Sequence, residues 1–284
     1  MPSLIDIRRR IRSVKNTQQI TKAMKMVAAA KLRRAQDRVI AARPYSAMME
    51  RMLANVAAAV SNLDSSERDP LLAVRPENRI QVILVTSDRG LAGSFNSNLI
   101  KGAQKFVAGH ASAKIEFETV GRKGREFFKK RATITGETTG IKTPQVSDAR
   151  AISERVAERY IKDEIDAVYL IYNEFKSVIA QQFMSKRVLP VELPEEQAGL
   201  DYIYEEPPQE LLGTLLPRYI EGQIFRALLE STAAEHAARM TAMDAASSNA
   251  SDVIDKLTLY MNRVRQASIT KEIIEIVSGA AALE

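Results

Sequence analysis

Hydrophobic residues near the amino terminus recur every three or four positions, which is the spacing of one face of a helix in a coiled coil. Residues 3–69 contain no glycine and one proline, Pro44, so little else interrupts a helix there. We expect a helix that is kinked at Pro44 and ends between residues 62 and 69. The stripe before Pro44 consists of Leu4, Ile7, Ile11, Val14, Gln18, Thr21, Met24, Ala28, Leu32, Ala35, Val39 and Ala42, and after it Met48, Met52, Val56 and Val60 are expected to continue the same face.

The carboxyl-terminal part of the chain has the same character. Residues 218–284 contain no proline and two glycines, which predicts a second long helix starting near Pro208 or Pro217. A long helix cannot bury its own apolar face, so we expect the two helices to form an antiparallel coiled coil. Because the second helix is the longer, its end should extend past the first by about 10 to 19 residues, or about 15–28 Å. Its seam positions are Ala250, Ile254, Leu257, Met261 and Val264.

Between the two helices the hydrophobic period changes to that of strands. Residues 80–86, 114–120, 167–172 and 177–191 are predicted strands, the last being one long strand or two. Residues 96–110, 122–131 and 147–164 are predicted helices. Strands that alternate with helices indicate a central α/β, Rossmann-like layer domain with a mostly parallel sheet. The predicted domains are therefore a coiled-coil helix at 1–65, the α/β domain at 66–208 and a coiled-coil helix at 209–284.

Composition excludes several classes of protein. None of the 284 residues is cysteine, so no disulfide framework or thiolate metal site is expected. No apolar run approaches the roughly 20 residues of a membrane span, and the first 12 residues do not resemble a secretory signal. We expect a soluble protein.

Charge is distributed unevenly along the chain. Residues 1–43 hold twelve Lys and Arg against two acids, a balance of +10 in a chain whose net charge is +6. Such a helix is either a solvated face or a surface for nucleic acid, an anionic membrane or an acidic protein. No aromatic residue precedes Tyr45, which disfavours the stacking that single-stranded nucleic acid requires.

No candidate catalytic constellation is present in the sequence. The loop Ser87–Asn96 follows the first strand, but its glycine spacing matches no phosphate-binding motif and favours a tight turn into a helix. His110 and His236 are the only histidines and are far apart, and the Glu pairs at 195–196 and 205–206 adjoin prolines as loop acids do. We therefore expect no catalytic residue, metal or cofactor, and an interaction or mechanical role.

Two terminal stretches carry a family resemblance. Residues Ile20–Gln36 and Arg265–Ala281 closely resemble the terminal signatures of the gamma subunit of F-type ATP synthase. Residues Asp88–Gly93 and Asp201–Glu205 also resemble that family, which commonly has a cysteine where this chain has Ala92. The redox-regulatory cysteine insertion of the chloroplast members is absent.

The resemblance implies a central rotor stalk that is not itself an enzyme. The family's coiled coil enters a ring of three alpha and three beta subunits, and its α/β domain contacts the epsilon subunit and the membrane rotor ring of c subunits. Such a subunit transmits torque between the proton-driven ring and the catalytic beta subunits, so that ion flow is coupled to ATP synthesis or hydrolysis and ATPase activity is regulated. The implied location is peripheral, on the cytoplasmic face of the bacterial inner membrane, with no nucleic acid or small-molecule substrate as partner.

The resemblance also assigns contacts to individual residues. Lys22, Met24, Lys25, Arg33 and Arg34 match positions that face an acidic loop of beta. Arg265 and Gln266 match residues that contact a second beta loop, the catch loop, and Gly279, Ala280 and Ala281 match the tip that turns in an apolar bearing.

Two other functions stay open on the residues alone. One is a basic coiled coil that binds nucleic acid, whose affinity would fall steeply with salt. The other is a nucleotide-binding α/β enzyme with helical arms.

Overall fold

The computed structural model describes residues 3–60, 69–192 and 205–281. The chain forms two compact units. We call residues 1–28 and 240–284 the helical unit, and residues 29–239 the sheet unit. Helices α1 (Leu4–Val60) and α5 (Pro208–Ala281) each contribute to both units.

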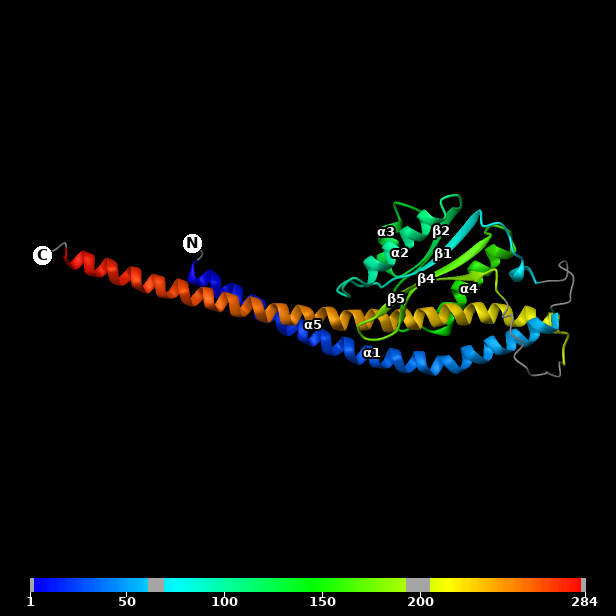
Figure 1. Ribbon diagram of the computed structural model, residues 1–284, viewed down its shortest axis with the longest axis horizontal. Coiled ribbons are helices and arrows are strands. Elements are labelled where there is room, and N and C mark those ends of the chain that lie inside the picture. Colours follow the sequence, from blue (N-terminus) through cyan, green and yellow to red (C-terminus); the bar gives the residue numbers. More distant parts are fainter. Residues whose placement is uncertain (1–2, 61–68, 193–204, 282–284) are drawn as a thin grey trace. The chain divides into compact units, whose positions relative to one another are not determined.

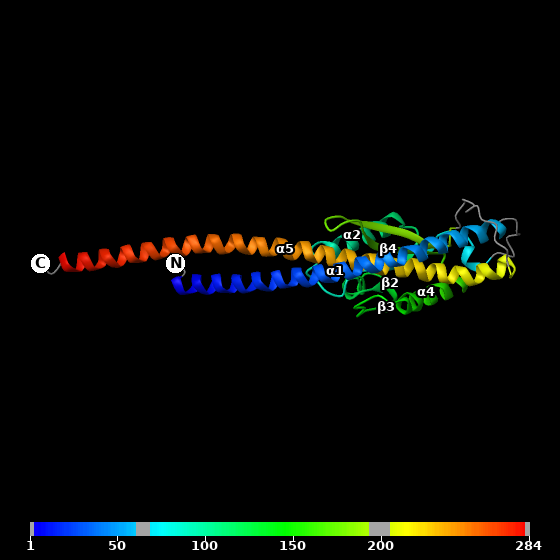
Figure 2. The ribbon, with the colours of Figure 1, turned by 90° about the horizontal axis from the view of Figure 1, so that it is seen from below.

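In the helical unit the two ends of the chain lie side by side and antiparallel (Figures 1 and 2). Gln18 and Thr21 of α1 contact Ser247 of α5, and Lys25 contacts Asp244, so residue numbers fall on α5 as they rise on α1. The predicted seam is confirmed in this unit, because each of its positions is buried or half-buried. These positions are Leu4, Ile7, Ile11, Val14, Gln18, Thr21, Met24 and Ala28 on α1, and Ala250, Ile254, Leu257, Met261 and Val264 on α5.

The carboxyl-terminal end of α5 extends beyond the start of α1, as predicted (Figure 1). Every residue from Ile269 to Ser278 is exposed. Five of these exposed residues are large and hydrophobic, namely Ile269, Ile273, Ile274, Ile276 and Val277. An exposed apolar helix end of this kind indicates a surface that another protein covers.

The sheet unit is built on a five-stranded sheet in the order β3-β2-β1-β4-β5. Strands β3, β2, β1 and β4 are parallel to one another, and β5 pairs antiparallel with β4. This arrangement confirms the predicted α/β layer with a mostly parallel sheet. The strands are β1 (Arg79–Val85), β2 (Lys114–Val120), β3 (Thr133–Thr138), β4 (Ala167–Phe175) and β5 (Gln181–Leu189).

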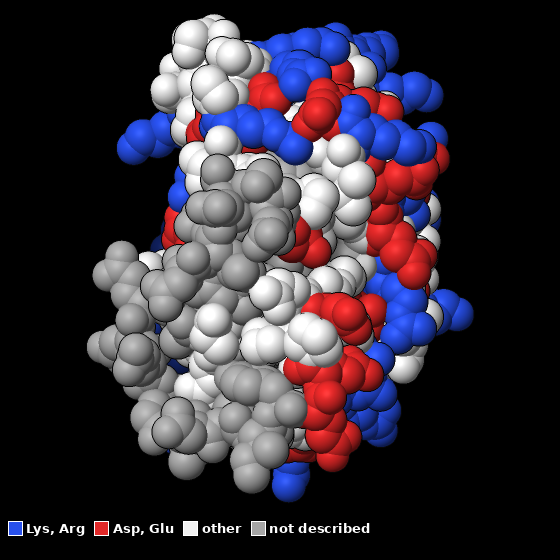
Figure 3. Space-filling view, turned by 90° about the vertical axis from the view of Figure 1, so that its right-hand side faces the viewer, with Lys and Arg blue, Asp and Glu red and all other residues white. Residues whose placement is uncertain are grey.

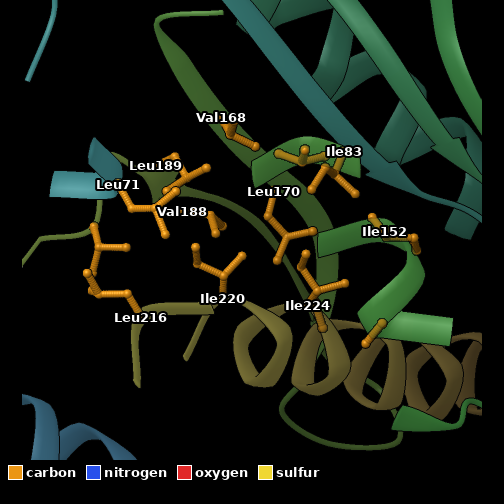
Figure 4. Packing of buried hydrophobic residues seen from close by; sticks show 14 of the residues in the cluster. Leu71, Ile83, Ile152, Val168, Leu170, Val188, Leu189, Leu216, Ile220 and Ile224 are labelled. Carbon is orange, nitrogen blue, oxygen red and sulfur yellow. The ribbon is translucent and has the colours of Figure 1, made fainter. Parts of the chain in front are cut away.

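Helices cover both faces of the sheet because β1 is hydrophobic on both. Its residues Ile80, Val82 and Leu84 pack on the face covered by α2 and α3, whereas Ile83 and Val85 pack on the face covered by α4 and α5. Figure 4 shows Leu216, Ile220 and Ile224 of α5 pointing toward the strands on the face covered by α4 and α5. The covering helices are α2 (Phe95–Gly109), α3 (Arg122–Phe128) and α4 (Val146–Ile161), and a short 3-10 helix, η2 (Pro70–Leu72), precedes β1.

One predicted helix face is wrong after Pro44. In the sheet unit Leu32, Ala35 and Val39 are buried and Ala42 is half-buried as predicted, and α1 continues through Pro44. Beyond it, however, Met48 and Met52 are exposed, while Met49 and Leu53 are buried together with the correctly predicted Val56. The side chain of Val60, and the predicted helix end at residues 62–69, lie outside the described residues.

Strand β3 was not predicted. It is a polar edge strand of six residues that contains Gly136, so it lacks the apolar run of the other strands. A Cβ on Gly136 would lie 2.1 Å from the carboxylate of Glu118 on β2. The glycine therefore makes room for Glu118, which is buried and pairs with Arg155 of α4 at 2.5 Å.

None of the helices in the described part of the chain has the length and apolar character that crossing a bilayer requires.

Candidate partner-binding surfaces

A polar layer sets the pairing of the two helices in the helical unit. The hydroxyl oxygens of Thr21 and Ser247 are 2.7 Å apart in a buried contact, and the Gln18 side-chain amide donates to the Ser247 carbonyl at 3.4 Å. Each hydroxyl also lies within hydrogen-bond distance of a carbonyl on its own helix, that of Gln18 at 3.0 Å for Thr21 and that of Met243 at 2.9 Å for Ser247. The layer therefore places Thr21 and Gln18 at the level of Ser247 without leaving either hydroxyl unsatisfied.

The three predicted contact residues of this unit differ in availability. Lys22 is exposed and has no ion pair with any described residue. Lys25 is half-exposed, and its ammonium group lies 2.6 Å from the Asp244 carboxylate. Met24 is half-buried in the seam. Because an exposed ion pair contributes only about 0–1 kcal/mol, Lys25 can exchange Asp244 for an acidic partner at little cost.

Arg33 and Arg34 belong to the sheet unit and are both exposed. Arg34 borders a pocket that also contains Lys31, Arg38 and Lys142. Lys31, Arg38 and Lys142 are not among the predicted contact residues. The spacing of Lys31, Arg34 and Arg38 on one helix face could have indicated the cluster, but Lys142 is far away in the sequence.

Arg265 and Gln266 are exposed in the helical unit, close to the level where α1 begins. They are 21 residues beyond Asp244 on one helix, which places them about 30 Å along the axis from the Lys25 contact. The two groups of predicted contact residues therefore lie at separate levels of the unit. Gly279, Ala280 and Ala281 are helical, and their side chains lie outside the described ones.

The loop after β1 is a tight turn into α2, as predicted. Leu91 and Gly93 have positive φ values of 64° and 55°, and α2 begins two residues later. The carboxylate of Asp88 accepts hydrogen bonds from the backbone N–H of Arg122 at 3.0 Å and of Gly140 at 2.8 Å. Arg122 is the first residue of α3, and a phosphate at the start of that helix would need its N–H group. Here the protein's own carboxylate occupies it.

A half-buried ion pair on α5 lies beside this loop. The Arg239 guanidinium contacts the Glu235 carboxylate at 2.7 Å and donates to the Gly90 carbonyl at 3.2 Å. Burial raises the pKa of Glu235 above its ordinary value. Burial, reinforced by Arg239 and Lys31, lowers the pKa of His236 to about 4, so this imidazole is neutral at pH 7. These groups hold α5 against the loop, and no metal-binding cluster of His, Asp or Glu occurs among the described residues.

Comparison with known proteins identifies the family. A family model described as ATP synthase matches residues 3–283. The ATP synthase gamma chain of Solibacter usitatus is 64% identical, and that of Pelotomaculum thermopropionicum is 50% identical; in both cases all of each chain is covered. None of these comparisons supports the nucleic-acid-binding alternative.

Solved structures agree with this result. A chain in the central stalk and c-ring structure of the Tetrahymena thermophila mitochondrial ATP synthase has a TM-score of 0.62 and 26% identity, with 80% of this chain and 99% of that chain covered. A chain of the Euglena gracilis mitochondrial ATP synthase has the same fold at a TM-score of 0.66 and 20% identity, with 99% and 94% covered. The chain belongs to the ATP synthase gamma chain family.

Proposed function

We propose that the chain is the central rotor stalk of an F-type ATP synthase. In this role it transmits torque between the proton-driven membrane rotor ring and the three catalytic beta subunits, and it regulates ATPase activity without catalysing a reaction itself. The observation that carries the proposal is the match over the whole chain to ATP synthase gamma chains, 64% identical in one bacterial relative. The bacterial relatives also support a peripheral location on the cytoplasmic face of the inner membrane.

The geometry of the helical unit suits this role. Three polar contacts join α1 to α5 at one level, namely Thr21–Ser247, Gln18–Ser247 and Lys25–Asp244, and slippage of one helix along the other would break all three. The exposed hydrophobic residues between Ile269 and Val277 need a surrounding apolar sleeve, which three alpha and three beta subunits would supply. Gly279, Ala280 and Ala281 would form the tip within that sleeve.

Three segments divide this work. We assign residues 1–65 and 209–284 to the shaft and residues 66–208 to the domain that docks on the epsilon subunit and the c-ring. Lys22, Met24, Lys25, Arg33 and Arg34 are the proposed contacts for the acidic loop of beta. In the helical unit Lys22 has no ion pair with any described residue. Lys25 would have to break its ion pair with Asp244 before it could contact the beta loop.

Arg265 and Gln266 are the proposed contacts for the beta catch loop. We expect Arg265→Ala and Gln266→Ala each to lower the ATP turnover of a complex reconstituted from this chain with alpha and beta. The expected decrease is about tenfold, which corresponds to the loss of one charge-assisted hydrogen bond in the rate-limiting transition state. The matched control is Lys256→Ala, an exposed cation on the same helix.

The measurement is ATPase activity of purified complexes in which the ratio of subunits has been verified. Turnover in the two variants equal to that of the Lys256→Ala complex would contradict the assigned contacts. Failure of the unsubstituted chain to assemble with alpha and beta would contradict the rotor proposal itself.

A further inference from the structure

A small basic pocket lies within the sheet unit. It is formed by one face of α1, the loop between β3 and α4, and one face of α5, and it has a volume of about 180 Å³. Lys31, Arg34 and Arg38 come from α1, Lys142 from the loop, and Thr232 and His236 from α5. Its volume corresponds to about six water molecules, and is below the range of about 300–1,000 Å³ for pockets that hold drug-sized ligands.

Charge in this pocket is of one sign. Four of its lining residues are cations and none is a carboxylate. No ion pair joins Lys31, Arg34, Arg38 or Lys142 to any residue that the structure describes. The nearby Glu235 is held by Arg239 at 2.7 Å and is therefore already paired.

Elsewhere in the unit many cations have a carboxylate beside them. Acidic and basic side chains lie next to one another on the face shown in Figure 3. Arg79, for example, pairs with Asp166 at 2.6 Å, and Arg159 with Glu116 at 2.8 Å. Four exposed cations that line one pocket without a counterion give it a positive potential, and a concave surface concentrates that field. Such a pocket attracts a multiply charged anion.

Hydrogen-bond donors are present besides the cations. Nδ1 of His236 is 3.4 Å from Arg239, and a guanidinium can only donate, so Nδ1 accepts and Nε2 carries the proton. The imidazole thus offers one N–H group. The Thr232 hydroxyl donates to the Leu228 carbonyl at 2.7 Å, so its oxygen is only an acceptor. The donors are accordingly ammonium, guanidinium and imidazole N–H groups, which suit phosphate oxygens.

We propose that this pocket is a binding site for a small phosphate anion, with inorganic pyrophosphate or the diphosphate group of a nucleotide as the chemistry it fits. The site borders the seam at Ala35 and does not include Arg265. It shares Arg34 with the proposed contacts for the acidic beta loop, so a bound anion and that loop would compete for this side chain.

The test is isothermal titration of the full isolated chain with pyrophosphate, phosphate and ADP in separate experiments. We expect saturable binding of pyrophosphate that weakens as salt is raised, and a loss of about tenfold or more in affinity for Lys142→Ala and Arg38→Ala, because each removes a charge-assisted contact. ADP binding as tightly as pyrophosphate would identify a nucleotide's diphosphate as the ligand, whereas a preference for pyrophosphate would identify the free anion.

Lys101→Ala is the matched control, since it removes one exposed cation from α2 of the same unit, away from the pocket. A second readout is the thermal unfolding midpoint, which a ligand of the folded state raises. It should rise with pyrophosphate in the unsubstituted chain and in Lys101→Ala, and should rise less in Lys142→Ala at the same pyrophosphate concentration. No saturable binding at millimolar pyrophosphate, or equal affinities in Lys142→Ala and Lys101→Ala, would overturn the proposal. Because these measurements need neither alpha nor beta, their failure leaves the rotor proposal standing.

Discussion

At the scale of single residues, His236 makes the stability of the sheet unit depend on pH. Its pKa is lowered from 6.5 to about 4, chiefly by burial and then by Arg239 and Lys31. The unfolded chain therefore binds a proton at a higher pH than the folded chain does. Stability from this group is fully present above pH 6.5 and is lost as the pH falls toward 4.

We expect this loss to be about 1–3 kcal/mol for His236 alone. The variant His236→Gln keeps a polar side chain that does not titrate in this range. The measurement is the difference in free energy of unfolding between the unsubstituted chain and His236→Gln, followed from pH 7 to pH 4. The difference should shift in favour of the variant as the pH falls, and a difference that is constant with pH would contradict a buried neutral imidazole.

Residue-level prediction from sequence worked where the seam is regular and failed where a polar residue stands in it. From Leu4 to Ala42 the spacing alone placed every seam position correctly. After Ala42 the seam continues at Ser46, Met49 and Leu53. Hydrophobicity predicted Met48 as the next seam residue, but the half-buried Ser46 lies in the seam instead. The Ser46 hydroxyl donates to the Ala42 carbonyl, which satisfies it within the helix and makes it tolerable there.

At the scale of elements, Gly121 joins β2 to α3 under a strict steric limit. Its φ is 90°, and a Cβ at this position would lie 2.1 Å from the backbone oxygen of Thr86. Both groups are backbone, so neither can move away cheaply. This close approach also brings the N–H of Arg122 to the carboxylate of Asp88.

Gly121→Ala should therefore lower the free energy of unfolding by about 3 kcal/mol or more. Gly90→Ala is the matched control, because Gly90 is exposed in the loop after β1, has no positive φ and has no atom within 4 Å of an added Cβ. Its effect should stay below about 1 kcal/mol. Urea unfolding followed by circular dichroism measures both, and equal midpoints for the two variants would show that the turn is not under the constraint described.

Element types followed from the sequence where hydrophobic runs are strong. The strand at 114–120 was predicted with its observed bounds, and 177–191 contains the single strand β5. Strand β3 could not be predicted because its place in the sheet depends on contacts with residues far away in the sequence. Gly136 leaves room for the Glu118 side chain, and Glu118 can be buried because Arg155 of α4 pairs with it. The basic pocket was missed for the same reason, since Lys142 and His236 join the α1 cations only in the fold.

At the scale of the whole molecule, a rotor stalk requires the paired termini to act as an axle within other subunits. The sequence alone predicted the paired helices, because two long helices without helix breakers each require a partner helix. The two terminal stretches also resemble a family that the family model confirms. The contacts of this chain with the surrounding subunits form only in the assembled complex, so the roles assigned to Lys22, Arg265 and Gln266 stay predictions.

Rotation of single complexes tests the central claim most directly. The chain has no cysteine, so Lys105→Cys, on the exposed face of α2, gives one site for attaching a visible probe. Complexes with alpha and beta are fixed to a surface through the beta subunits, supplied with ATP and observed by microscopy. We predict that the probe turns continuously in one direction while ATP is hydrolysed and stops when ATP is removed. A stationary probe on complexes that hydrolyse ATP at full rate would contradict the rotor account.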